Sequence, residues 1–500
     1  MGKRAKWMWG LMAIILLGGL AVWRYGHPHS SVVSDKTKTT RRVTQSGRIN
    51  HPQISQSRLM AGVIEGFYGP QWSYAETKQM FGFMQREGLN TFVYAPKNSP
   101  YLRAQWNRLY PSNKLKGIAG LVHAAERDHI QFVCSISPGL SIDYGSAKDQ
   151  GELEAKINQL WSVGIHSFMV SFDDIPPQLP PSQAGEYHNN LALAQAQLVN
   201  KIYVEERKKD HMLTMLFTPT AYWGLNNNTY WNTLKMDLNA KIPVIWTGPG
   251  VLSKTITQQQ VLTVKHDMGH SLIIWDNYPV NDYTYVMEHH PQLFMGPLMG
   301  RGAQVLSAVR GYLFNPMLQP YASEVALATG ASYLRHPLTY RPQQAWLHEL
   351  ALWKEPTGKA LQSFAGANSV SYLNTEPLDQ LNSHMKSFWQ SYAGHKNLMG
   401  SALYKQFVRW NDSSAILRDH LPSPYYDEIR PWLNIYRQEA QLGMHVSAAL
   451  AHPQLTSASL TRQLITEQNR INGSAYRLGV HVMLQSWFAK AFRQPPFVLR

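Results

Sequence analysis

The 500-residue sequence contains a single cysteine, Cys134, which excludes any disulfide within the chain. A fold without disulfides must be stabilised by its core. The hydrophobic fraction of 44% and the aromatic fraction of 11% are enough to build a large one, so wholesale disorder is excluded. Cys134 lies in the apolar segment QFVCSISP, which favours a small buried side chain over a nucleophile. The length predicts two or three domains.

Acidic residues are also scarce, because 32 Asp and Glu stand against 47 Lys and Arg and leave a net charge of +15. The excess is concentrated at one end of the sequence. Residues 1–60 contain ten basic residues and one acid, Asp35, and so hold nine of the fifteen net charges. A nucleic-acid-binding groove needs its basic residues on the folded surface, so we expect no nucleic-acid partner.

One long hydrophobic run, WMWGLMAIILLGGLAVW, occupies residues 7–23 behind Lys3, Arg4 and Lys6. Basic residues before such a run keep that end in the cytoplasm and send the rest of the chain outward. No small-x-small cleavage site follows it, so residues 1–25 are interpreted as an uncleaved signal anchor in preference to a cleaved signal peptide. We expect residues 7–23 to contact a membrane and residues 26–57 to form a basic polar linker. The folded part is then extracytoplasmic and membrane-anchored, or secreted if cleavage occurs.

Short apolar runs alternate with amphipathic stretches from residue 58 onward, which indicates strands paired in parallel. Eight such units match the size of a (β/α)8 TIM barrel, an α/β fold that we assign to residues 58–340. A doubly wound open sheet is the alternative, because strand counts from sequence err by one or two. The expected strands are residues 59–66, 91–95, 131–136, 167–172, 213–217, 243–246, 271–275 and 309–314.

Helical patterns lie between most of the expected strands. Residues 74–87 carry the best one, because Ser73 and Glu76 have the spacing of a capping box. The others are residues 151–163, 186–208 and 256–267, and the connection after the seventh strand is the least helical. From about residue 340 strand signals fade, and apolar residues recur at three-and-four spacing in residues 343–353, 378–393, 401–410, 426–452 and 461–472. We therefore expect a C-terminal α-helical domain at residues 341–500.

Two adjacent carboxylates, Asp173 and Asp174, end the fourth expected strand, and catalytic groups of a TIM barrel lie at strand ends of this kind. Mutual repulsion and desolvation raise the pKa of at least one, which gives a neutral acid beside an ionised base. Glycoside hydrolysis uses such a pair. Neighbours in sequence can hardly flank a glycosidic bond, but they suit a substrate whose own 2-acetamido oxygen attacks. A helix N-cap pair or a metal site is the alternative.

Other polar and aromatic residues follow the expected strands. Tyr222 is a candidate donor to an acetamido oxygen, or only a tyrosine at the rim. Trp275 suits a wall that faces a sugar, or core packing. Asn277, Asp282 and Asn315 are candidates for binding sugar hydroxyls, with turn formation as the alternative.

Four further residues carry charge or metal-ligand chemistry. Lys97 is interpreted as a ligand for a hydroxyl or as the partner of an acid. Glu65 is a third carboxylate, or a residue in a salt bridge inside the barrel. His289 and His290 are adjacent and have no third ligand at fixed spacing, which makes a poor metal site. We expect neither a metal nor another cofactor.

Seven motifs occur in the order seen in family 84 of the glycoside hydrolases: GVIEGFYGPQWSYAE, YAPKNSPY, SFDDI, WTGP, WDNYPVNDY, FMGPLMGR and GYLFNPMLQPYASEVAL. Over about residues 60–335 the chain resembles that family. The family contains the β-N-acetylglucosaminidases that remove O-linked GlcNAc from proteins, and enzymes once labelled hyaluronidases. The resemblance implies a (β/α)8 barrel and a retaining, substrate-assisted, metal-free mechanism through an oxazoline intermediate.

The same resemblance implies roles for nine residues. Asp173 matches the residue that holds and polarises the acetamido nitrogen, Asp174 the general acid/base, and Tyr222 the tyrosine that supports the acetamido group. The other six match positions that bind the sugar: Trp275 and Asn277 in the acetamido pocket, Asp282 at the 4- and 6-hydroxyls with Asn315 beside it, and Gly66 and Lys97.

These observations predict a retaining β-N-acetylglucosaminidase that removes terminal β-linked GlcNAc from a glycoprotein, a glycan or a cell-wall fragment. The first alternative is an enzyme for another 2-acetamido sugar, or an endo-acting enzyme of the hyaluronidase type. The second is a non-catalytic barrel that binds GlcNAc. The chain departs from many bacterial relatives in two ways: the basic linker and hydrophobic run replace a small α/β domain, and the proline-rich residues 175–181 follow the acids. Both departures concern the natural substrate more than the reaction.

Overall fold

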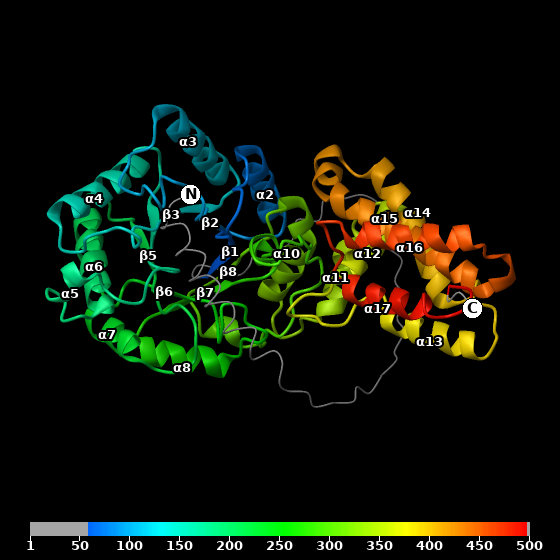
Figure 1. The fold of residues 1–500 in the computed structure, drawn as a ribbon. Coiled ribbons are helices and arrows are strands. Elements are labelled where there is room, and N and C mark those ends of the chain that lie inside the picture. The colour runs from blue at the N-terminus through cyan, green and yellow to red at the C-terminus, as the bar shows by residue number, and fades with distance from the viewer. Residues whose placement is uncertain (1–58, 498–500) are drawn as a thin grey trace.

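The computed structural model describes residues 59–497, and its first part is a closed barrel of parallel strands (Figure 1). Each strand pairs with the next, and β8 closes the ring on β1, with Met60 opposite Gly311. Closure confirms the (β/α)8 prediction and excludes the doubly wound open sheet. The strands are β1 (Met60–Glu65), β2 (Thr91–Tyr94), β3 (Gln131–Ile136), β4 (Ser167–Ser171), β5 (Thr214–Thr218), β6 (Val244–Trp246), β7 (Leu272–Asp276) and β8 (Gly311–Phe314).

The barrel interior is filled by side chains, because alternate residues of each strand point inward. Aliphatic residues dominate this inner core, among them Ile64, Val133, Leu216 and Leu313. Trp275 belongs to the same cluster at the carboxyl end of β7. A filled interior leaves the mouth of the barrel as the place where a ligand can bind.

Helices surround the barrel, and several begin at the caps that the sequence encodes. The capping box of Ser73 and Glu76 starts α2 as expected, and Thr257 with Gln260 makes a second box at α8. The helix expected over residues 186–208 begins later, because Asn190 accepts the capping hydrogen bond. The helices that follow strands are α2 (Tyr74–Arg86), α3 (Ser112–Arg127), α4 (Ala147–Trp161), α5 (Pro181–Ala184), α6 (Leu191–Lys209), α7 (Thr229–Asp237), α8 (Gln258–Met268) and α10 (Pro320–Arg335).

The connection from β7 to β8 is different, as its sequence indicates. It contains only the short helix α9 (Asp282–Val286) and the 3-10 turn η2 (Val305–Ser307), with irregular backbone between them. The expected pair His289 and His290 lies in this irregular stretch.

A helical region follows α10 and lies beside the barrel, with α10 and α11 between the two parts (Figure 1). Five of its helices match the expected segments to within a few residues, except that α14 continues ten residues further. Two helices, α12 and α17, are not predicted from the sequence, because their apolar patterns are short. The region comprises α11 (Pro342–Ala351), α12 (Thr357–Ala367), α13 (Leu381–Ala393), α14 (Ala402–His420), α15 (Ser423–Ala451), α16 (Ala458–Asn472) and α17 (His481–Ala491).

The expected signal anchor or signal peptide and the basic linker lie outside the described residues. Within residues 59–497, no helix combines the length and the apolar character needed to cross a membrane.

The packing of α14 on α15 can be tested by its effect on the free energy of unfolding, with a second glycine as the control. Gly443 of α15 faces the Phe407 ring, and a Cβ added there would lie 2.5 Å from a ring carbon. In contrast, a Cβ on Gly151, an exposed position of α4, would lie within 4 Å of no described residue outside its own helix. We expect Gly443→Ala to lower the free energy of unfolding by roughly 1–3 kcal/mol through overpacking. Gly151→Ala is expected to raise it by roughly 0.5–1 kcal/mol, since alanine favours a helix.

Urea unfolding monitored by circular dichroism measures both changes. Equal effects of the two substitutions would contradict the close approach of α14 and α15.

Candidate active site

The nine residues selected from the sequence line one cavity at the carboxyl ends of the strands. The cavity is open to solvent, and about 650 Å³ of space not filled by protein atoms lies within it and its mouth. The ends of β1, β2, β4, β5, β7 and β8 all contribute, because a closed parallel barrel presents them on one side. The residues that meet there are Gly66, Lys97, Asp173, Asp174, Tyr222, Trp275, Asn277, Asp282 and Asn315.

Asp173 is buried between two cations. Lys97 forms an ion pair with Asp173 Oδ2, and both side chains are almost completely buried. Arg103 donates to the Asp173 backbone carbonyl at 3.5 Å. Burial raises the pKa of Asp173, but Lys97 and Arg103 outweigh it and hold the pKa below its ordinary value. The expected rise in pKa therefore does not occur at Asp173. Its Oδ1 has no hydrogen-bond partner among the described residues.

Asp174 is held by two tyrosines. Tyr68 donates to Oδ2 at 2.9 Å and Tyr222 donates to Oδ1 at 2.8 Å. The Asp174 backbone has φ +54°, a left-handed conformation that a residue other than glycine rarely adopts. Arg103 Nη2 donates to the Asp174 carbonyl at 3.0 Å and so fixes this turn. The two neighbouring acids thus have different partners and different surroundings.

Both tyrosines are uncharged donors. Burial and the nearby Asp174 raise the pKa of Tyr68 and of Tyr222 well above the ordinary value. Their hydroxyl protons are thus available to a carboxylate or to a ligand oxygen throughout the neutral range.

Asp282, the first residue of α9, reaches the cavity from the β7–β8 connection. Its Oδ2 accepts a hydrogen bond from the Tyr68 backbone N–H at 2.8 Å. Burial raises the pKa of Asp282 to about 6, and the bond from Tyr68 only partly opposes this. Its charge therefore changes within the range in which an enzyme is commonly assayed.

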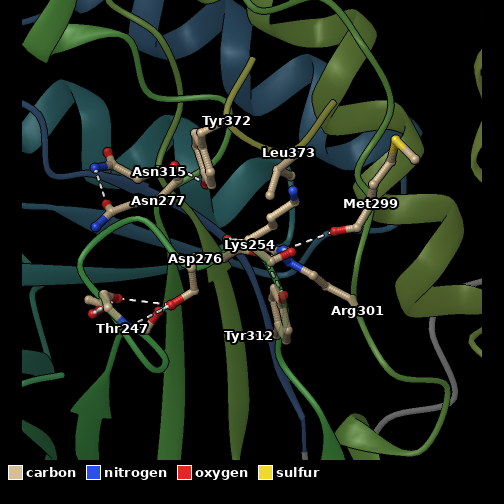
Figure 2. Close-up of polar contacts among 12 residues, drawn as sticks. Thr247, Lys254, Asp276, Asn277, Met299, Arg301, Tyr312, Asn315, Tyr372 and Leu373 are labelled. Carbon is tan, nitrogen blue, oxygen red and sulfur yellow. Dashed lines mark hydrogen bonds and ion pairs between the residues drawn. The ribbon is translucent and has the colours of Figure 1, made fainter. Parts of the chain in front are cut away.

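Amide groups connect three strand ends across the floor of the cavity. Asn315 Oδ1 accepts from the Gly66 backbone N–H at 3.2 Å, and Asn315 Nδ2 donates to Asn277 Oδ1 at 2.8 Å (Figure 2). Asn277 Nδ2 in turn donates to the Val251 carbonyl at 2.8 Å. This chain fixes the orientation of both amides, so their remaining donors and acceptors have defined directions.

Trp275 forms a wall of the cavity. Its Nε1 is buried and has no hydrogen-bond partner within residues 59–497, and Lys97 Nζ lies 5.0 Å from the ring centroid. Gly66 allows the ring to lie here, because any Cβ at that position would overlap the indole. The wall therefore depends on a residue without a side chain at the end of β1.

Asp276 lies between Trp275 and Asn277 and points the other way, into a buried network (Figure 2). Arg301 donates two hydrogen bonds of 2.8 and 2.5 Å to its carboxylate, and Tyr312 donates a third at 2.5 Å. Arg301 also donates to the carbonyls of Lys254 and Met299. This network anchors the end of β7 and so determines where its two cavity-facing neighbours lie.

Glu65 does not line the cavity. It is fully buried, accepts the Trp72 backbone N–H at 3.0 Å, and is in no ion pair within the described chain. Burial raises its pKa to about 8. The interpretations as a third site carboxylate and as a salt-bridged residue are therefore both wrong.

His289 and His290 also lie away from the cavity. The part of the chain that the structure describes contains no group of three or more His, Cys, Asp or Glu suited to a metal ion.

Sequence reasoning missed several residues of the site. Tyr68 and Arg103 contact the acids, and the Asp276–Arg301 pair lies behind the cavity. Tyr68 follows the first strand in the motif EGFYG, so its position at a strand end was a usable signal. The remaining lining residues that were not selected are Thr218, Thr247, Val251, Leu252, Val280 and Tyr283.

A TIM barrel with paired carboxylates, amides and a tryptophan around one cavity has the site of a glycoside hydrolase. The family model described as beta-N-acetylglucosaminidase matches residues 61–366. The chain therefore belongs to this family of glycoside hydrolases.

Individual relatives agree with this assignment. Proteins named Protein O-GlcNAcase from Rattus norvegicus and Mus musculus are each 33% identical over 284 residues, which are 56% of this chain and 30% of the relative. The chain thus matches less than a third of the length of these curated relatives. A solved structure of an O-GlcNAc hydrolase mutant from Thermobaculum terrenum has a TM-score of 0.79 and 29% identity, covering 87% of this chain and 94% of that one. The structure of CpGH84B has the same fold, with a TM-score of 0.75, 23% identity, and coverage of 87% and 76%.

The buried pair of Lys97 and Asp173 predicts a non-additive effect on stability. Lys97→Met leaves the buried Asp173 carboxylate without its ion-pair partner and is expected to lower the free energy of unfolding by roughly 3–5 kcal/mol at pH 7. Adding Asp173→Asn removes that charge, so the double variant is expected to be more stable than Lys97→Met alone. The stabilisation of the native pair is present above the ordinary carboxyl pKa and is lost as the pH falls through the lowered value.

Urea unfolding of both single variants and the double variant, at pH 7 and pH 4, measures the coupling. Strictly additive losses at pH 7 would contradict the ion pair.

Proposed function

We propose that the protein is a retaining β-N-acetylglucosaminidase that hydrolyses terminal β-linked GlcNAc, with the acetamido oxygen of the sugar as the nucleophile. The observation that carries the proposal is the unequal partnering of two adjacent acids at one cavity, Asp173 with cations and Asp174 with phenols. Acids on neighbouring residues cannot stand on opposite faces of a glycosidic bond, as an ordinary retaining enzyme requires. They can act together on a substrate that supplies its own nucleophile and closes to an oxazoline.

Asp173 is assigned to the acetamido N–H. Its lowered pKa keeps it ionised at neutral pH, and its Oδ1 is a buried acceptor that no group in the described part of the chain bonds. A hydrogen bond from the acetamido N–H to this oxygen would orient the amide and increase the electron density on its carbonyl oxygen. The negative charge also stabilises the positive charge that develops on the nitrogen as the ring closes.

Asp174 is assigned as the general acid and then the general base. As an acid it gives a proton to the leaving oxygen, and as a base it takes a proton from the water that opens the oxazoline. Tyr222 is assigned to exchange its bond with Asp174 for one to the acetamido oxygen, and its raised pKa keeps it a donor. Tyr68 remains on the other oxygen of Asp174 and holds the carboxylate in place.

The remaining residues are assigned to binding. Trp275 and Asn277 would enclose the acetamido group, and Asp282 with Asn315 would bind the sugar hydroxyls. Lys97 and Gly66 complete the sugar site. The names of the relatives support O-linked GlcNAc as the class of substrate.

The natural carrier of the sugar is proposed to be a glycoprotein, a glycan or a cell-wall fragment outside the cytoplasm. This rests on the hydrophobic run at residues 7–23 behind basic residues, which we propose as a membrane anchor. A fusion of residues 1–58 to alkaline phosphatase tests export and retention in the membrane fraction.

Turnover of aryl β-N-acetylglucosaminides tests the reaction and the role of Asp174. Asp174→Ala is expected to lower kcat/KM by roughly 10²–10⁴-fold on an alkyl glycoside, whose leaving oxygen needs a proton. On the 2,4-dinitrophenyl glycoside, which leaves without protonation, the loss in the first step is expected to be far smaller. Asp419→Ala, which removes an exposed carboxylate paired with Arg418 in α14, is the control and should behave as wild type.

Equal losses on both substrates would remove Asp174 from the role of acid. A wild-type protein that binds the sugar without turnover would instead favour a non-catalytic barrel, and turnover of polymeric hyaluronan alone would favour an endo-acting enzyme.

The pH dependence of kcat/KM tests Asp282. As an ionised acceptor it binds sugar hydroxyls, and protonation removes that ability, so kcat/KM is expected to fall below a pKa of about 6. The slope should approach tenfold per pH unit, since one proton is involved. Asp173, whose pKa is lowered, titrates below this range. In Asp282→Asn, kcat/KM is expected to be lower than in the wild type and to show no fall at acidic pH. A fall that persists at the same pH would assign this titration to another group.

A further inference from the structure

The helical region is joined to the irregular β7–β8 connection by hydrogen bonds to its backbone. Trp432 of α15 donates from Nε1 to the Pro291 carbonyl at 2.9 Å. Trp346 of α11 donates from Nε1 to the Met295 carbonyl at 2.7 Å. The Met295 N–H donates to the carbonyl of Asn368, directly after α12, at 2.9 Å. Segment 291–296 thus has its backbone fixed by several elements outside the barrel.

The loop after α12 continues this contact toward the active site. Gly296 lies so close to the Ser369 backbone that a Cβ on Gly296 would be 2.6 Å from the Ser369 carbonyl oxygen. The loop is itself held in a turn, because the Ser371 N–H donates to the Asn374 carbonyl at 2.8 Å. Residues 369–374 therefore form a fixed projection of the helical region against the barrel.

Tyr372 extends from this loop to the sugar site (Figure 2). Its hydroxyl donates to the Asn277 backbone carbonyl at 2.7 Å, and its ring packs edge-on against Tyr278 with centroids 6.0 Å apart. Burial and the nearby Asp276 raise the pKa of Tyr372 well above its ordinary value, so the hydroxyl remains a donor at all working pH values.

The bond from Tyr372 fixes the backbone of a residue that lines the cavity. The Asn277 side chain is fixed by Asn315 and by the Val251 carbonyl, and the preceding Asp276 is fixed by Arg301. The Asn277 backbone carbonyl accepts a hydrogen bond from the Tyr372 hydroxyl, so this donor comes from the helical region. Without it, the peptide between Asn277 and Tyr278 loses one of its two hydrogen bonds, the other being that of the Tyr278 N–H to the Asp276 carbonyl at 2.8 Å. A small rotation of this peptide would move the Asn277 side chain relative to the sugar.

We infer that Tyr372 is a positioning residue for sugar binding, and that through it the helical region forms part of the GlcNAc site. The inference rests on the proposed function. Tyr372 acts through Asn277 and need not touch the substrate. Its loss is therefore expected to weaken binding of the sugar while protonation by Asp174 is unaffected.

Tyr372→Phe tests this inference, because it removes the hydroxyl and keeps the ring on Tyr278. The expected result on 4-nitrophenyl β-N-acetylglucosaminide is a KM raised by roughly tenfold, the effect of one buried hydrogen bond, with kcat changed less than about threefold. Calorimetric binding of free GlcNAc should weaken by a similar factor. The ratio of activities on alkyl and dinitrophenyl glycosides should stay as in wild type.

Tyr340→Phe is the matched control. Tyr340 also donates to a backbone carbonyl, that of Leu298, at 2.8 Å, and packs edge-on against Tyr333, but Leu298 does not line the cavity. Both variants lose one buried phenol hydroxyl, and thermal unfolding should record similar losses of stability, while only Tyr372→Phe raises KM.

Three results would overturn the inference. Unchanged KM and GlcNAc affinity in Tyr372→Phe would show that the bond does not position the site. An equal rise of KM in Tyr340→Phe would assign the effect to general loss of stability. A wild-type protein without turnover would overturn the proposed function and this inference with it, so the two failures are distinguished by the wild-type assay.

Discussion

The site depends on a cation placed against one of two adjacent carboxylates in a buried setting. Two neighbouring aspartates at a strand end repel each other, and burial penalises the charge of Asp173. Lys97 and Arg103 remove this penalty for Asp173, whose pKa falls below its ordinary value. Asp174 has phenols as partners, which donate hydrogen bonds and carry no charge. One local motif thereby provides two acids in different environments, as acid–base chemistry on a single sugar requires.

This arrangement relies on barrel closure and on supports behind the cavity. Closure brings the end of β2, which carries Lys97, to the same mouth as the end of β4. Behind the mouth, the Asp276–Arg301 pair anchors the end of β7, and the loop after α12 fixes the segment that follows it. The irregular β7–β8 connection has little regular structure of its own, so its geometry is supplied by the helices packed against it. The geometry of the barrel mouth therefore depends on the helical region as well as on the barrel.

The fold was largely predictable because its signals are local. Apolar runs of strand length, Ser73 with Glu76 at α2, and the apolar spacing of the C-terminal helices all appear directly in the sequence. Helix starts were predicted less well, since Asn190 and Ser146 cap α6 and α4 at positions that the apolar pattern alone does not reveal. The helices α12 and α17 are short and rich in small or aromatic residues, and their burial comes from neighbours distant in the chain.

The sequence by itself determined which residues are available to the chemistry. Paired acids, amides and aromatics follow strands of a periodic α/β pattern, and a periodic pattern places strand ends together. Only the tertiary structure decided what each group can do. The charge state of Asp173, the phenols on Asp174, the raised pKa of Asp282 and the hydroxyl of Tyr372 on Asn277 all join residues that are far apart along the chain or depend on burial. Electrostatic energies depend on distance and on the exclusion of water, and neither is encoded in local spacing.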